Sequence, residues 1–411
     1  LIYGAKGANL LCFEEKVAEL NETTGDSLPV INIEVPDFLA VSVDMYKAWL
    51  EDPKLFEKMC EQARQGALDL LVRKEYEDII DLVAVRSSAV KSEDGDEHSG
   101  AGVYTSLCVD PRDQEAFRSA VVSVYESTNS HSARTYQKDI GVDNEVMGLV
   151  IQRYQEGKYI DRDTYFGHIN SQGINPNIIE IHTNEGILYY DKSQVRENLL
   201  IYPKDRFNGG SYMHTSPDHR SKLSSAAHRT NNVPHAVVLA EKLFGRPMQL
   251  EFVDNVIVQA RPLKTDNIEA LPISFPEDIE SVADCSATGI GDMELDRLDG
   301  RSNNTEKTGF IIVWQEYGFT IGRSGASYDS FPKEGAVVVM NPSSSGHIQA
   351  ICREKGLLCF FPKKGTSIEH IEDLIFPSND GLQSSDGFSN EPVDIKFRFV
   401  ADGYDGRIYK V

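Results

Sequence analysis

The chain has 411 residues, of which 40% are hydrophobic and 26% are charged, and this is the composition of a globular protein of about two or three domains. With 41 Lys and Arg against 64 Asp and Glu, the net charge of −23 argues against nucleic-acid and anionic-membrane partners, although a few local cations suffice to bind a small phosphate-bearing molecule. No stretch of about 18 apolar residues is present and the six cysteines form no CxxC pair, which favours a cytoplasmic protein with free thiols.

Residues 1–265 combine helical and strand patterns, which predict one mixed α/β unit. Helices are expected over 43–71, 114–139 and 233–244, the last one ending at Gly245. Strands are expected within 29–42 and over 81–87, 145–154, 177–182, 186–190, 248–252 and 256–259. The last four of these strands are expected to form two hairpins. The polar segment 193–229 has no pattern that indicates a helix or a strand. The chain begins at Leu1 without a leader, so a first strand is expected to precede it.

A second, smaller unit is predicted over 301–411, after a linker over 266–300 that is rich in acidic residues and contains Pro272 and Pro276. Its pattern favours β-strands, which are expected over 310–314, 336–340, 357–361, 395–400 and 407–411. One helix is expected at about 347–355. The chain as a whole is therefore predicted to be α/β (α+β), with two domains of unequal size.

Four segments carry residues suited to phosphate chemistry. The first, Gly4–Leu10, surrounds Lys6 with small residues, so that the backbone can approach a phosphate group that the ammonium neutralises. The alternative is an ordinary glycine-rich turn before a helix, because the segment does not have the Walker spacing.

The second segment follows the strand expected over 81–87. Arg86 leaves this strand for a Ser- and Gly-rich loop in which Gly100, Ala101 and Gly102 are able to close over a triphosphate. The planar guanidinium suits phosphate oxygens, and ligands of α/β folds bind at the ends of strands. The alternative is a surface hairpin with a solvated arginine.

The third segment is the hairpin over 248–262. Glu251, Gln259 and Arg261 are expected to project to one side of it, because Gln259 and Arg261 are two residues apart. Carboxylate and amide oxygens suit Mg²⁺, and the cation suits the phosphates of a nucleotide. The alternative is a cross-strand ion pair between Glu251 and Arg261 that contributes little.

The fourth segment places His347 in the first turn of the second unit's helix, after a Ser/Gly loop. Free N–H groups and the partial positive charge of the helix end would stabilise a phosphoryl group on the imidazole, and Ser345 is able to donate a hydrogen bond to it. Covalent catalysis by histidine divides one transfer into two steps. The alternative is a histidine that only caps the helix.

In this order, the segments resemble the pyruvate phosphate dikinase and phosphoenolpyruvate synthase family. Residues 4–10 resemble the family pattern GGKGANL, residues 35–42 resemble VPPGFxVT, and residues 85–103 resemble VRSSxxxED…SFAGQ. Residues 150–154 resemble VxVQRMV, residues 244–262 resemble FGxPxDIEW…QARP, and residues 345–356 resemble TSHAAIxARExG. The resemblance implies an ATP-grasp nucleotide-binding domain over 1–265, joined to a phosphohistidine swivelling domain of β/β/α type over 301–411.

The resemblance also implies roles for the motif residues. The residues expected to bind the nucleotide are Lys6, Arg86, Gly100, Ala101, Gly102, Gln152, Tyr154, Glu251, Gln259 and Arg261. Glu251 and Gln259 would bind Mg²⁺, Lys6 and Arg86 would hold the triphosphate, and His347 would accept the phosphoryl group. ATP and Mg²⁺ are then the cofactors, and AMP with phosphate or pyrophosphate the products. The acceptor is expected to be a small molecule, water or a protein.

Several positions depart from the family patterns. Asp37 stands at a glycine position, Val103 at a glutamine position, and Ile348-Gln349-Ala350 replaces AAI after the histidine. The chain also has no room for a pyruvate-binding barrel of about 250 residues. Two alternatives therefore stay open: a nucleotide-binding regulatory module that has lost turnover, and an ATP-grasp ligase that forms an acyl phosphate without using His347.

Overall fold

The computed structural model contains three β-sheets and the helices that pack around them. It describes residues 2–23, 35–72, 82–95, 98–154, 166–172, 176–183, 186–192, 233–253, 256–263, 275–276, 281, 283–288, 290–296, 307–313, 328–339, 345–362, 396–402 and 405–410. The polar segment 193–229, which was not assigned from its pattern, lies outside the described residues.

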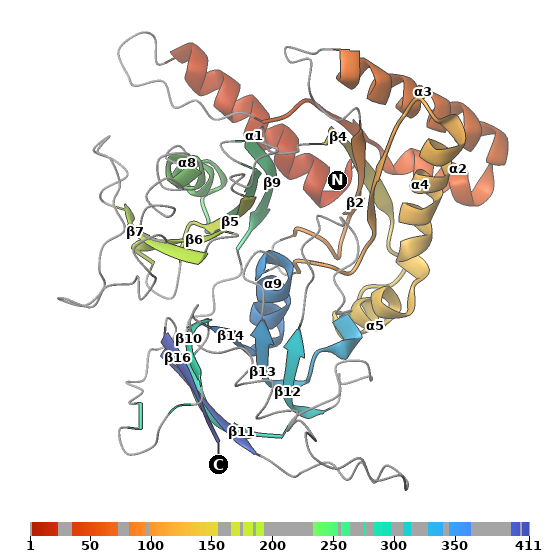
Figure 1. Ribbon diagram of the computed structural model, residues 1–411. Helices are drawn as coiled ribbons and strands as arrows, with labels where there is room; N and C mark the ends of the chain where they lie inside the picture. The colour runs from red at the N-terminus through yellow and green to blue at the C-terminus, as the bar shows by residue number, and fades with distance from the viewer. Residues whose placement is uncertain are drawn as a thin grey trace, which may run out of the picture.

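The first sheet has four antiparallel strands in the order β1-β4-β2-β3. They are β1 (Phe38–Val41), β2 (Val83–Ala89), β3 (Ser106–Val109) and β4 (Met147–Arg153). The helices around this sheet are α1 (Gly4–Thr23), α2 (Val43–Glu51), α3 (Pro53–Val72), α4 (Gln114–Glu126) and α5 (His131–Asp139), with a short 3₁₀ turn, Ser127–Asn129, before α5 (Figure 1). The predicted strands over 81–87 and 145–154 are confirmed as the two central, largely buried strands.

Two stretches that were expected to be single helices are each divided in two. Between α2 and α3, Asp52 Oδ1 accepts hydrogen bonds from the backbone N–H groups of Lys54 and Leu55, both at 3.1 Å. Pro53 begins α3, a position that tolerates proline because the first N–H groups of a helix have no intrahelical partner. Ser130 caps α5 similarly, since its Oγ accepts from Ala133 N at 3.1 Å.

The second sheet has five antiparallel strands in the order β7-β6-β5-β8-β9. They are β5 (Phe166–Asn170), β6 (Ile178–Thr183), β7 (Gly186–Asp191), β8 (Met248–Val253) and β9 (Val256–Pro262). Both predicted hairpins are confirmed, and β5 joins them by pairing with β6 and β8. Alternate side chains, among them Ile169, Ile181 and Leu250, form an apolar cluster with α8 (Val233–Phe244). The opposite face of the sheet is polar.

The third sheet has seven strands in the order β11-β15-β16-β10-β14-β13-β12. They are β10 (Ala283–Thr288), β11 (Ile290–Leu295), β12 (Thr308–Val313), β13 (Glu334–Val339), β14 (Leu358–Pro362), β15 (Phe397–Asp402) and β16 (Asp405–Lys410). A 3₁₀ turn, Tyr328–Ser330, precedes β13. Strands β12, β13 and β14 are parallel, and α9 (Ser345–Lys355) makes the crossover from β13 to β14 that parallel neighbours require.

The stretch 266–300, expected to be a linker, contains β10 and β11 of this third sheet. The acidic residues that suggested a linker occupy alternate positions of β11, where Asp292 pairs with Arg398 of the neighbouring strand at 2.7 Å between Oδ2 and Nη2. A strand with one charged face and with Gly291 inside it has low hydrophobicity, so its pattern resembles that of a loop.

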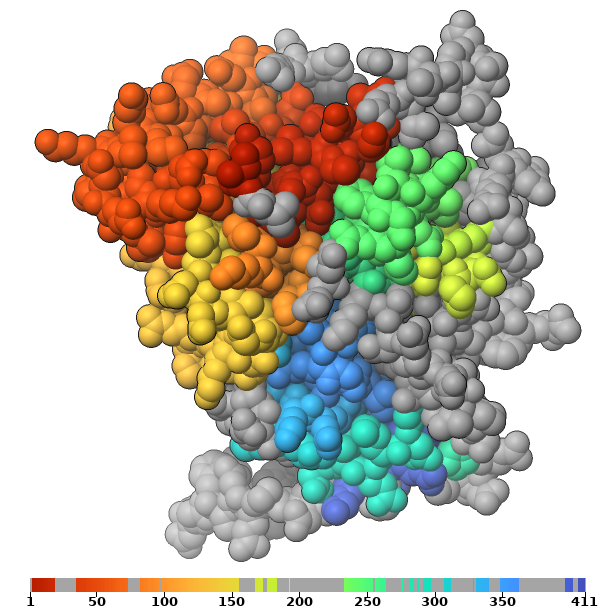
Figure 2. Space-filling model, turned by 180° about the vertical axis from the view of Figure 1, so that it is seen from behind, coloured from red at the N-terminus to blue at the C-terminus, as the bar shows by residue number. Residues whose placement is uncertain are grey.

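Helix α9 lies where the three sheets approach one another (Figure 1). Its side chains Ile348, Ile351 and Cys352 belong to one buried apolar cluster that also contains residues of the first sheet and of α2 to α5. In the view from behind (Figure 2), the blue region that includes α9 lies against the yellow region of α4 and α5. The first and third sheets therefore share a continuous core through this helix.

Candidate nucleotide-binding site

The polar face of the second sheet carries two rows of side chains that run across four of its strands. Strand register aligns one row as His182, His168, Glu251 and Gln259, and the next as Glu180, Asn170, Gln249 and Arg261. Residues of the two rows that share a strand are two positions apart, so all of these side chains lie on the same face. All are buried except Glu251, which is half-buried.

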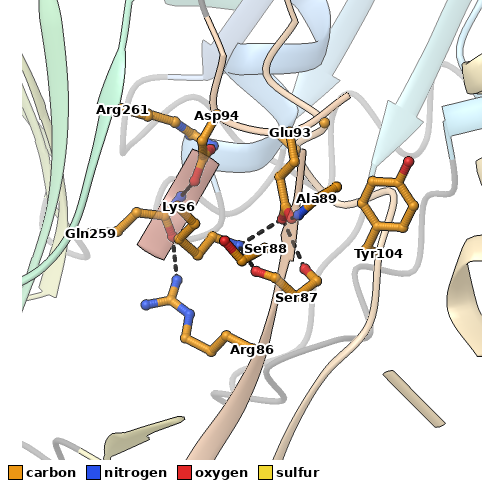
Figure 3. Close-up of polar contacts among 12 residues, drawn as sticks. Lys6, Arg86, Ser87, Ser88, Ala89, Glu93, Asp94, Tyr104, Gln259 and Arg261 are labelled. Atoms are coloured by element: carbon orange, nitrogen blue, oxygen red, sulfur yellow. Dashed lines mark hydrogen bonds and ion pairs between the residues drawn. The ribbon is translucent and has the colours of Figure 1, made fainter. Parts of the chain in front are cut away.

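Arg86 links this polar face to the first sheet. Its Nη2 donates hydrogen bonds to Gln259 Oε1 (Figure 3) and to Glu251 Oε2 at 3.2 Å. Its Nη1 donates to Val258 O at 3.0 Å. The arginine side chain is 11% exposed, so Arg86 is not the solvated surface arginine of the alternative interpretation. The guanidinium instead occupies the space between β2 and the hairpin of β8 and β9.

Lys6 lies in the first turn of α1, where the sequence suggested a glycine-rich loop. Its Nζ donates to Glu93 Oε1 at 2.6 Å and to Ser87 O at 2.9 Å, and Glu93 Oε2 accepts from Ala89 N at 3.0 Å (Figure 3). Gly4 has a φ of +70°, and a Cβ at this position would lie 1.7 Å from a backbone oxygen of β2. Glycine at position 4 is therefore what lets α1 bring Lys6 against this strand.

Asp94 lies at the centre of the cluster, although it was not among the predicted site residues. Its Oδ2 accepts from Gln259 Nε2 at 2.7 Å, and its Oδ1 lies 3.8 Å from Arg261 Nη1 and accepts no hydrogen bond from the described residues. Burial raises the pKa of Asp94 to about 6, against the opposing effect of Lys6 and Arg261. Its φ of 49° is left-handed, a conformation that costs a non-glycine residue energy and is concentrated at functional sites.

The oxygen atoms of this cluster fit a magnesium ion held jointly with a nucleotide. Glu251 Oε2 and Gln259 Oε1 converge on the same nitrogen of Arg86, and the two residues face each other across β8 and β9. Mg²⁺ is usually bound by one or two carboxylates together with waters and phosphate oxygens, and Asp94 Oδ1 adds a third buried oxygen. Within the described ranges, no three His, Cys, Asp or Glu side chains are grouped to bind a metal by themselves.

The loop at Gly100, Ala101 and Gly102 is packed against its surroundings. Gly100 has a φ of +57°, and its N–H donates to the hydroxyl of Tyr136 in α5 at 3.0 Å. A Cβ at Gly100 would lie 2.4 Å from a backbone oxygen of Ser92. The loop expected to close over a triphosphate is therefore held in this structure by α5 and by the preceding segment.

Two of the residues expected to bind the nucleotide, Gln152 and Tyr154, lie at the end of β4. Gln152 is buried, and its Oε1 accepts from Arg86 Nη1 at 3.3 Å, so this side chain lies with the charged cluster. Tyr154 follows the strand, is half-buried, and donates its backbone N–H to Leu82 O at 3.0 Å.

His347 lies in the first turn of α9, as the sequence predicted, and its side chain lies outside the described residues. A cavity of about 20 Å³, enough for roughly one water molecule, lies beside the place where this helix contacts the polar face. Its lining includes Arg261 from β9 and Ala350 and Glu354 from α9. These two α9 residues follow His347 by one and two helical turns, so the cavity lies along the helix face on which position 347 falls.

Five residues of the polar rows were not recognised from the sequence: His168 and Asn170 of β5, Glu180 and His182 of β6, and Gln249 of β8. The sequence carries a signal for the first four, because FGHIN and IIEIHT both alternate polar and apolar residues. Such alternation also fits a solvated face, but α9 covers this part of the sheet and buries these residues.

Comparison with known families gives a match for part of the first sheet, namely β2, β3 and β4, with most of α3 and the whole of α4 and α5. Residues 60–160 match the family model described as pyruvate phosphate dikinase, AMP/ATP-binding domain. The matched span contains Arg86, Asp94, the loop from Gly100 to Gly102, Gln152 and Tyr154. No curated protein matches the chain. None of the helices in the described ranges is both long and apolar enough to cross a membrane.

Proposed function

We propose that this chain is an ATP-dependent phosphotransferase of the dikinase type, which passes a phosphoryl group from ATP through His347 to an acceptor. The observation that carries the proposal is the convergence of Lys6, Arg86, Gln259 and Arg261 from α1, β2 and β9. Residues this far apart in sequence gather three cations around the carboxylates of Glu93, Asp94 and Glu251, next to a region similar to an AMP/ATP-binding domain.

In this proposal the nucleotide binds between the first and second sheets. Lys6, Arg86 and Arg261 hold its phosphates, and Glu251 and Gln259 hold Mg²⁺, which supplies charge neutralisation when bound. The internal ion pairs keep these side chains oriented before the nucleotide arrives, so little reorganisation is needed when the phosphates replace Glu93 and Glu251 as partners of the cations.

The first turn of α9 supports His347 as the phosphoryl carrier. N–H groups at a helix start stabilise an added negative charge, and Ser345 lies two residues before the histidine. The β-phosphoryl group would pass to His347 and AMP would leave, while the γ-phosphoryl group would go to water, giving phosphate, or to inorganic phosphate, giving pyrophosphate. The acceptor then takes the phosphoryl group from the histidine.

The experiment is incubation of the intact chain with Mg²⁺ and ATP labelled at the β- or γ-phosphate. We expect acid-labile label from β-labelled ATP on the protein, formation of AMP, and loss of both in His347→Ala. His131→Ala, which changes an exposed histidine at the start of α5, is the matched control and should retain the label. Full turnover in His347→Ala would instead favour an ATP-grasp ligase.

A nucleotide-binding regulatory module is the second candidate. Lys6 is already paired with Glu93 at 2.6 Å inside the protein, and Gln349 occupies a position where the family pattern has alanine. This candidate predicts that ATP raises the unfolding temperature without forming AMP. Steady release of AMP excludes it.

A further inference from the structure

Helix α9 contacts the nucleotide-binding unit through three polar side chains at separate places. Gln349 reaches β5 and β6, Arg353 reaches β6, and Glu354 reaches α5 and the segment before Gly100. The apolar side chains of the same helix lie in the shared core. Apolar contact gives attraction without direction, so the register of the helix depends on these polar contacts.

Gln349 is fully buried and contacts two histidines whose rings are stacked on each other. The ring centroids of His168 and His182 are 4.4 Å apart, with 10° between the ring planes. Gln349 Oε1 accepts from His168 Nε2 at 2.9 Å, and Gln349 Nε2 donates to His182 Nε2 at 3.2 Å. The primary amide of a glutamine carries both a hydrogen-bond donor and an acceptor. It therefore fits two uncharged imidazoles, one of which presents an N–H group and the other an unprotonated nitrogen. Burial lowers the pKa of both histidines and so favours these uncharged forms.

The next turn of α9 adds two charged contacts. Arg353 Nη2 donates to Glu180 Oε2 at 3.0 Å, and Glu180 is almost fully buried. Glu354 accepts from the hydroxyl of Tyr136 at 2.6 Å and from Ser99 Oγ at 2.7 Å. A shift of α9 by one residue would leave these buried groups without partners, and unpaired buried polar groups are costly.

We propose that Gln349, Arg353 and Glu354 form a docking surface that fixes α9 in one register on the nucleotide-binding unit, with Gln349 as the main positioning residue. His168, which Gln349 contacts, is the cross-strand neighbour of Glu251. The docked register therefore brings the first turn of α9, with position 347, close to the row that contains Glu251 and Gln259. The docking rests on these contacts alone, whereas its role in presenting His347 to ATP rests on the proposed function.

The test replaces Gln349 by methionine in the intact chain, because methionine has a similar length and no hydrogen-bonding amide. Hydrogen exchange followed by mass spectrometry reports the opening of α9 and of β6 separately from the rest of the chain. We expect exchange in both elements to become roughly tenfold faster or more, while β15 and β16 stay unchanged. Gln62→Met, the same substitution at an exposed position of α3, is the matched control.

A second variant approaches the same contact from the other side. His182→Phe keeps a flat ring against His168 but removes the nitrogen that accepts from Gln349, so it should speed exchange in α9. Because the substitution lies in β6, any faster exchange in α9 cannot come from a change in the sequence of that helix. Unchanged exchange of α9 in both variants would overturn the proposal. If Gln349→Met loses protection from hydrogen exchange throughout β13 and β14, the third sheet has unfolded in that variant. The exchange of α9 in His182→Phe alone then tests the proposal.

The loading of His347 is measured on the same samples with β-labelled ATP. Faster exchange together with slower labelling supports both the docking and its role. The other outcome is faster exchange in the variants together with no uptake of label even by the unaltered chain. This result supports the docking surface and contradicts the proposed function. The two proposals therefore fail in distinguishable ways.

Discussion

Arg86 Nη2 lies 3.2 Å from Glu251 Oε2, although the two residues are 165 positions apart and belong to different sheets. The arginine comes from β2, inside the span that matches an AMP/ATP-binding domain, and the glutamate comes from β8, outside it. This ion pair thus joins the matched part of the chain to a sheet that lies outside the matched span. It also places the second sheet where a nucleotide held by Arg86 would meet it.

The first prediction concerns this ion pair. Arg86→Met should lower the free energy of unfolding by about 2–4 kcal/mol, because Glu251 and Gln259 lose the cation that pairs with them in a largely buried place. Urea denaturation measures the change. Arg112→Met removes an exposed arginine whose ion pair with Asp110 is exposed, and it should change stability by less than about 0.5 kcal/mol. Equal effects of the two substitutions would contradict this account of Arg86.

The second prediction concerns the buried pair of Lys6 and Glu93, whose side chains are 5% and 7% exposed. Lys6→Met leaves a buried carboxylate without its cation and should cost about 3–5 kcal/mol of folding stability. Adding Glu93→Gln to Lys6→Met should recover about 1–3 kcal/mol, since the uncompensated charge is then gone. A double-mutant cycle in urea measures the coupling, and strictly additive effects would show that the two groups do not depend on each other.

The sequence predicted the strands of the site better than it predicted the partners of its residues. The hairpin of β8 and β9 was expected from two apolar runs around a turn, and the alternation of side chains along β9 placed Gln259 and Arg261 on one face. Asp94 was not singled out, because its importance depends on burial and on contacts with Gln259 and Arg261 that only the folded chain brings together. Local pattern fixes which face a side chain occupies but not what covers that face.

The same limit explains the other differences. His168 and His182 occupy polar positions of short strands, a pattern that also fits a solvated sheet face. They are buried because α9 packs over them, with Gln349 lying 181 residues after His168 and 167 residues after His182. The strand β11 was missed because alternate acidic residues lowered its hydrophobicity, while the helix break at Pro53 was detectable from proline and the preceding aspartate alone.

The third prediction is a loss of stability in mild acid that depends on His182. Burial lowers its pKa from the ordinary value of about 6.5, against the opposing effect of Glu180, whose Oε2 lies 3.6 Å from His182 Nε2. The groups that face the ring from the neighbouring elements are His168, Glu180, Gln349, Arg353 and Phe361. Because the folded pKa is depressed, this contribution to stability is complete above the unfolded pKa and is lost as pH falls from about 6.5 through the folded value.

The unfolding free energy measured in urea between pH 7.5 and 5 checks this third prediction. His182→Phe should lose less stability over that range than the unaltered chain, because phenylalanine does not titrate, whereas Asp94 and His168 titrate in both proteins. A curve with the same slope in the variant would assign the acid sensitivity to other groups.

The last prediction concerns the magnesium ion. Glu251→Gln keeps an oxygen that accepts from Arg86 but removes the negative charge that attracts a divalent cation. Affinity for ATP in the presence of Mg²⁺ should fall roughly tenfold or more, whereas affinity for ATP in a metal chelator should change little or rise, since one repulsive charge near the phosphates is gone. Titration calorimetry with and without Mg²⁺ separates the two effects. Glu61→Gln alters an exposed glutamate on α3 that pairs with Arg64, and it should leave both affinities unchanged. If Glu251→Gln weakened ATP binding equally with and without Mg²⁺, Glu251 would act by orienting Arg86 and the metal would have to lie elsewhere.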